Sequence, residues 1–159
     1  MAKRSESELA RALARPDIEH LRAAVHAWHQ YYVFAFNGGT RERPQREIPE
    51  ELEPPDFRYF GYPRELAHDH IIACMMIALA ETEDENFLSF WAWGDFWNML
   101  HDADRTMLAR IEGEARRTPR FRWMLAHLHL HGVPKVQEML EQARRGAPSD
   151  GKMPPAPWV

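Results

Sequence analysis

The chain has 159 residues, of which 45% are hydrophobic and 28% are charged, and its formal net charge at pH 7 is −4. These proportions are ordinary for a single globular domain, and this length is enough to bury a core without disulfides. The one cysteine, Cys74, excludes an intramolecular disulfide, and the acidic balance argues against wholesale adhesion to nucleic acid or to an anionic membrane. The longest apolar run, 71–80, is too short to span a bilayer, and residues 1–8 lack the apolar segment of a secretory signal. We therefore expect a cytoplasmic protein with no membrane partner.

Two helices are predicted near the N-terminus. The sequence Ser5-Glu6-Ser7-Glu8 has the spacing of a capping box and predicts a short helix that reaches about Ala14. From Ile18 to Ala35, apolar residues recur every three or four positions, which predicts an amphipathic helix that begins near Pro16. The tripeptide Asn37-Gly38-Gly39 ends this helix, because glycine accepts the left-handed backbone at a helix C-terminus.

The middle of the chain predicts a long loop and two further helices. Residues 37–62 contain four prolines and predict an irregular connection that is unusually long for one domain. Residues 63–80 predict a helix that is apolar on every face, and such a helix is normally surrounded by others. Residues 86–116 predict one long helix, whose first turns carry several aromatic side chains.

Two short helices and a tail complete the predicted fold. Thr118-Pro119 predicts the start of a helix through Leu130, and residues 133–145 predict the last helix. We predict an all-α fold, an irregular bundle of five or six helices in one domain of residues 1–145, followed by a flexible tail, 146–159, rich in proline and small residues. The residues expected to meet in the core are Leu21, Val25, Trp28, Ile72, Met76, Leu100, Met107 and Leu128.

The nine histidines raise the question of a metal site. His127 and His131 form the best pair, since residues four apart lie on one face of a helix. His68-Asp69 and His101-Asp102 resemble the His-Asp dipeptide of the HD phosphohydrolases, but nothing else of that family's pattern surrounds them. A carboxylate-bridged centre would need Glu-x-x-His on two helices, which is absent at any plausible position. We therefore predict no metal and no cofactor, and keep a metal-dependent hydrolase or oxygenase as an alternative.

Other catalytic signatures are missing. Cys74 lies in the most apolar predicted helix, where a thiol is unreactive, and no serine stands in a Gly-x-Ser-x-Gly turn. No glycine-rich phosphate loop occurs either. The sequence therefore favours a protein that is not an enzyme.

The basic residues are mostly arginines, with lysine only at 3, 135 and 152. Arginine is well suited to bidentate contacts with phosphate or carboxylate groups. The arginines form two groups, which are either a solvated surface balanced by Glu112 and Glu114 or a surface for an anionic partner. We predict the second, with nucleic acid favoured over acidic protein. The residues expected to contact this partner are Arg116, Arg117, Arg120 and Arg122, together with Arg43 and Arg46 in the loop.

The aromatic residues of 86–97 cover more than half of a helix circumference. They either cover neighbouring helices or form an interface, in which case Trp91 and Trp97 are the expected contacts, since tryptophan is frequent at interface hot spots. The hypothesis that accounts for most of these features is a non-catalytic helical subunit or adaptor, with protein partners or self-assembly, that docks into a larger and possibly nucleic-acid-containing assembly. In size, helix content and arginine placement the chain resembles the small helical subunits of CRISPR ribonucleoproteins. A regulator that binds a small molecule beside the aromatic helix is a further alternative.

Overall fold

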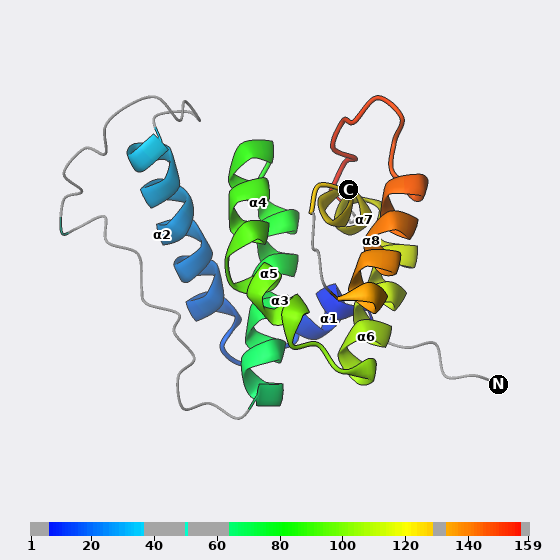
Figure 1. Ribbon diagram of the computed structural model, residues 1–159. Helices are drawn as coiled ribbons and strands as arrows, with labels where there is room; N and C mark the ends of the chain where they lie inside the picture. Colours follow the sequence, from blue (N-terminus) through cyan, green and yellow to red (C-terminus); the bar gives the residue numbers. More distant parts are fainter. Residues whose placement is uncertain (1–6, 37–49, 51–63, 129–132, 157–159) are drawn as a thin grey trace.

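A computed structural model describes residues 7–36, 50, 64–128 and 133–156, and the regular elements within them are all helices. The all-α prediction is thus confirmed, and the arrangement is an irregular bundle (Figure 1). Most of the predicted loop at 37–62 lies outside the described residues. Among the described helices, none combines the length and the apolar composition needed to cross a membrane.

The central element is helix α3 (Arg64–Glu81), as its apolar sequence predicts. It packs against α1 (Glu8–Leu13), α2 (Ile18–Phe36) and three later segments of the chain, the last of them the helix that starts at Pro119. Side chains 75–79 are completely buried, because neighbours cover α3 on every side. Helices α6 (Arg105–Arg117), α7 (Pro119–Ala126) and α8 (Pro134–Gly146) form a second group, on the other side of α3 from α2 (Figure 1).

The single long helix predicted over 86–116 is wrong, because the chain breaks it twice. Helix α4 (Glu85–Trp91) continues into a π-helical segment, η2 (Ala92–Phe96), in which Gly94 leaves helical geometry, and then into α5 (Trp97–His101). A new helix, α6, starts after Asp104, whose carboxylate accepts a hydrogen bond of 2.9 Å from the backbone N–H of Met107. Aspartate is unfavourable inside a helix and favourable at its N-cap, so residues 102–104 end one helix and start the next.

Local caps also set the other helix starts. The N-cap of α1 is Ser7, whose hydroxyl accepts from the backbone N–H of Ala10 at 3.0 Å, so the first cap is not the predicted Ser5. Asp84 caps α4 in the same way. Helices α7 and α8 begin at Pro119 and Pro134, where the missing N–H of proline costs nothing.

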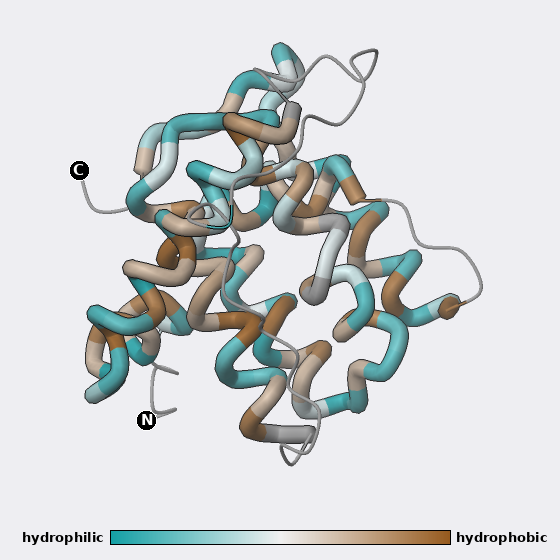
Figure 2. The backbone as a smooth tube through the Cα atoms, turned by 90° about the vertical axis from the view of Figure 1, so that its left-hand side faces the viewer, coloured by the Kyte–Doolittle hydropathy of each residue, from teal (hydrophilic) through white to brown (hydrophobic). Residues whose placement is uncertain are grey.

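The predicted core is confirmed for the described residues. The seven aliphatic members named from the sequence are each at most 5% exposed and belong to one cluster, and Trp28 packs against that cluster half-buried. Hydrophobic and hydrophilic residues alternate along the helices (Figure 2), which is the pattern expected when each helix turns one side inward.

The C-terminal segment lies against the body over the part that the structure describes, whereas the sequence predicts a flexible tail. The indole N–H of Trp123 donates to the carbonyl oxygen of Gly151 at 3.0 Å, and the Arg120 guanidinium donates to that of Pro154 at 2.8 Å. Ala156 is only 8% exposed. Composition alone did not reveal these carbonyl acceptors, which the side chains of α7 hold in place.

Candidate functional site

Arg120, expected on the surface, is buried, so this expectation is wrong. Its side chain is 1% exposed, and it donates to the carbonyl oxygens of Leu79 at 2.7 Å and Thr82 at 3.3 Å. It also forms two 3.0 Å hydrogen bonds with the carboxylate of Glu83. Carbonyls in the last turn of a helix lack partners within the helix, so Arg120 satisfies the end of α3 from inside the molecule.

Arg122 is half-buried and is used in a similar way. Its guanidinium donates to the carbonyl oxygens of Ala115, near the end of α6, and of Gly146, at the end of α8, each at 3.0 Å. A positive charge at two helix C-termini is favourable because of the helix dipole. Arg122 therefore joins α6, α7 and α8 from a half-buried position.

Arg116 and Arg117 are exposed, as expected, at the end of α6. Arg116 lies 4.0 Å from the carboxylate of Glu112, and Arg117 lies 3.9 Å from that of Glu114. The pair of Arg116 with Glu112 is long and exposed, so it contributes little to stability. Arg43 and Arg46, the remaining candidates, lie outside the described residues. Of the predicted contact residues that the structure describes, the exposed ones are therefore Arg116 and Arg117. The fold brings other residues close to them.

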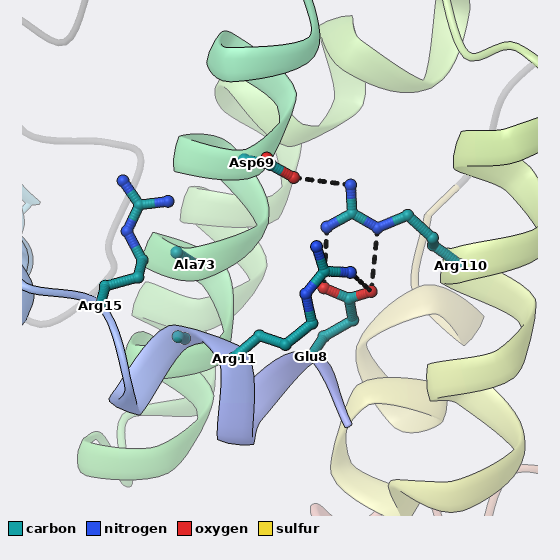
Figure 3. A pocket seen from close by; sticks show the side chains of 7 residues that line it. Glu8, Arg11, Arg15, Asp69, Ala73 and Arg110 are labelled. Atoms are coloured by element: carbon teal, nitrogen blue, oxygen red, sulfur yellow. Dashed lines mark hydrogen bonds and ion pairs between the residues drawn. The ribbon is translucent and has the colours of Figure 1, made fainter. Parts of the chain in front are cut away.

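Helix α1 is fixed beside α6 by a buried ion pair. Arg110 of α6 donates two hydrogen bonds of 2.9 Å to the two carboxylate oxygens of Glu8, whose side chain is 8% exposed. Arg110 also donates to Asp69 of α3 at 2.6 Å (Figure 3). The bidentate contact with Glu8 raises the pKa of Arg110 above its ordinary value. One guanidinium thus joins α1, α3 and α6.

A second carboxylate, that of Glu114, also holds α1 at this junction. It accepts a hydrogen bond of 2.8 Å from the backbone N–H of Glu8, at the first residue of α1. The hydroxyl of Thr118 donates to its other oxygen. A carboxylate at a helix N-terminus is favoured by the unpaired N–H groups there. Both carboxylates are therefore engaged in holding α1.

The junction leaves an open groove of about 800 Å³ between α1 and α6. Among the described residues, four arginines and two glutamates line it, which gives a net charge of +2, whereas the whole chain carries −4. Arg105 is exposed, and within the described part of the chain no acidic side chain pairs with it. The lining residues are Glu8, Arg11, Arg105, Thr106, Ala109, Arg110, Gly113, Glu114 and Arg117.

A smaller cavity of about 180 Å³ lies behind the groove, between α1, α3 and α6. Arg15, at its edge, pairs with Asp17 through bonds of 2.9 and 3.0 Å, and the pKa of Asp17 is lowered by this contact. Burial, together with the nearby charge of Arg15, lowers the pKa of His70. Every arginine of this cavity has a carboxylate partner, so we interpret it as structural.

The histidines that the structure describes do not converge on one point. His127 is exposed and donates from Nδ1 to the carbonyl oxygen of Trp123 at 2.8 Å, and His131 lies outside the described residues. His29 lies 3.0 Å from Asp84, while His101 contacts the carbonyl of Trp97. In the part of the chain that the structure describes, no three His, Cys, Asp or Glu side chains are placed to share a metal ion.

The two tryptophans expected at an interface are half-buried. Trp91 makes an edge-on contact with Trp28, with ring centroids 5.6 Å apart, and Trp97 covers His101 at 4.1 Å. Phe87 and Phe96, from the same stretch, are fully buried. The aromatic stretch thus serves the core in part, and an interface role for Trp91 and Trp97 stays a prediction.

Arg11 and Arg105 are not among the contact residues predicted from the sequence. Their joint placement depends on α1 meeting α6, and no local pattern indicates that contact. No protein family, no curated protein and no solved structure matches the chain. We therefore infer function from the geometry of the groove.

Proposed function

We propose that this protein is a non-catalytic helical subunit or adaptor that docks onto nucleic acid through the groove between α1 and α6, within a larger assembly. The observation that carries this proposal is the charge of the groove: its described lining residues have a net charge of +2 in a chain of net charge −4. A local positive surface attracts polyanions even where the whole molecule is acidic.

The spacing of the arginines supports an extended ligand. Arg105 and Arg117 are twelve residues apart on α6, which corresponds to about 18 Å along the helix axis. Arg11 lies on the opposite wall, on α1. A ligand with one charge would need only one of these positions. A chain of phosphates would engage all three, since backbone contacts require only well-placed positive groups.

The rest of the lining favours nucleic acid over an acidic protein. Between the arginines, the described lining consists of Thr106, Ala109 and Gly113 with the two glutamates, and it contains no large apolar side chain. Protein partners usually gain most of their affinity from aromatic or aliphatic anchors in pockets. A groove without such pockets gains little from a peptide beyond its charge.

The glutamates of the groove support binding rather than catalysis. Glu8 is held by Arg110, and Glu114 by the backbone of α1 and by Thr118. A general base must reach a proton of the substrate, and these carboxylates already accept hydrogen bonds from the fold.

Fluorescence anisotropy with labelled single-stranded RNA and DNA tests this proposal. Changing Arg11, Arg105 and Arg117 together to Ala should weaken binding by about tenfold or more at low salt, because three phosphate contacts are removed. The matched control is Arg145→Ala, which removes an exposed arginine from α8, outside the groove. Equal affinity of wild type and triple variant for nucleic acid, or tighter binding of an acidic polypeptide such as poly-glutamate, would overturn the proposal.

A further inference from the structure

We infer that the groove between α1 and α6 holds the sugar–phosphate backbone of a single strand and does not read its bases. This inference rests on the proposed function and specifies the ligand. Proteins that bind single strands through their bases stack them on aromatic side chains. Among the described residues that line the groove there is no aromatic side chain and no Asn or Gln. The groove therefore offers charge to the backbone and no stacking platform to the bases.

The size of the groove selects a single strand. Its volume of about 800 Å³ is comparable to sites that enclose a drug-sized molecule. A duplex is much bulkier than a drug-sized molecule, because one of its own grooves already accepts an entire protein helix. A short stretch of single strand fits between α1 and α6, whereas a duplex would touch only the rim.

The floor of the groove lets a backbone approach closely. Thr106, Ala109 and Gly113 follow one another at spacings of three and four on α6, so they share one face. A Cβ atom added at Gly113 would meet no other atom within 4 Å, so the space above this residue is open. A methyl group should be accommodated there, while a larger side chain would occupy the path of the strand.

The arginines that line the groove differ in how exposed their side chains are. Arg110 is bound on both sides, by Glu8 and Asp69. Arg11, Arg105 and Arg117 are all exposed, and the side chains of Arg11 and Arg117 are 46% and 33% accessible although each also lies near a glutamate. We therefore assign three phosphate contacts to Arg11, Arg105 and Arg117. For a single strand, three contacts predict a slope of about −2 for the logarithm of affinity against that of salt concentration.

The test uses the full chain with labelled oligo(U), oligo(A) and oligo(C) RNA of equal length, and a duplex of matched length, across a salt series. The three single strands should bind within about threefold of one another, and the duplex about tenfold more weakly. Arg105→Ala should reduce the salt slope by about 0.7, because one contact is lost.

A pair of variants at Gly113 separates the groove from general surface charge. Gly113→Leu, which changes no charge, should weaken the binding of oligo(U) at least about fivefold, while Gly113→Ala should bind as wild type. Circular dichroism confirms that both variants are folded. Equal binding of the duplex, preference for one base by more than about tenfold, or unchanged binding by Gly113→Leu would overturn this inference and leave the proposed function in place. Absence of binding to every oligonucleotide would instead overturn the proposed function.

Discussion

Arg110 on α6 holds Glu8 on α1 through two hydrogen bonds of 2.9 Å, although the two residues are 102 positions apart in the chain. Helix α1 has six residues, which is too short to be stable by itself in water. This ion pair therefore fixes α1, which forms one wall of the groove, to α6, which forms the other wall.

Replacing Arg110 by Met should destabilise the protein by about 2–3 kcal/mol, because it leaves the carboxylate of Glu8 in a site that is only 8% exposed. Urea unfolding followed by circular dichroism measures this change. The double variant Arg110→Met with Glu8→Leu should recover part of the loss, since the buried carboxylate that lost its partner is then absent. A single variant within about 0.5 kcal/mol of wild type would show that the pair contributes nothing.

Replacing Arg120 by Met should cost about 3 kcal/mol, because the carbonyl oxygens of Leu79 and Thr82 lose their donor inside the protein. The same change at Arg116, whose side chain is 78% exposed, should alter the free energy of unfolding by less than about 0.5 kcal/mol. Chemical denaturation of both variants provides the comparison. Equal stability of the two would contradict the structural role of Arg120.

The Arg120 variant should also loosen the C-terminal segment, since Arg120 donates to the carbonyl of Pro154. Amide hydrogen exchange should become faster around Met153 than in wild type, whose backbone N–H there is bonded to Glu85 at 3.2 Å. Unchanged exchange would mean that Trp123 and Glu85 hold the segment without help.

His70 should make stability depend on pH below about 6.5. Burial and the charge of Arg15 lower its pKa in the folded state, although Asp17 and Asp69 oppose this shift and His20 adds to it. As the pH falls below the ordinary histidine value of about 6.5, the unfolded chain takes up a proton before the folded protein does, so stability decreases. The contribution of His70 is thus fully present above that value and is lost as the pH falls towards the folded pKa.

Thermal or urea unfolding between about pH 7 and pH 5 measures this dependence. His70→Gln should flatten the decline by up to about 1.4 kcal/mol per pH unit, the limit for one proton. His101→Gln replaces an exposed histidine on α5 and should leave the decline as in wild type. An unaltered profile in the His70 variant would show that another group titrates instead.

Leu100→Ala should destabilise the protein by about 2–5 kcal/mol, because Leu100 is completely buried in the core and its removal leaves a cavity. Leu66→Ala removes the same atoms from a residue that is 51% exposed and should change stability by less than about 0.5 kcal/mol. Guanidinium unfolding of the pair tests the burial of α5 directly, and similar losses at both positions would contradict it.

The sequence by itself determined which segments are helical and which of their sides face inward. The apolar spacing from Ile18 onward and the uniformly apolar stretch 71–80 predict α2 and the buried centre of α3. Thr118-Pro119 predicts the start of α7. These features depend on interactions within a few residues, namely caps, propensities and the period of a helix, so they can be found without knowing the fold.

Only the tertiary structure decided which arginines stay at the surface. Arg116 and Arg120 are only four residues apart, yet one is 78% exposed and the other is 1% exposed, because Arg120 meets the unpaired carbonyls at the end of α3. The groove likewise depends on contacts between distant segments, among them the ion pair of Glu8 with Arg110. Such contacts form between segments that are distant in sequence, and their energy depends on geometry that no local pattern encodes.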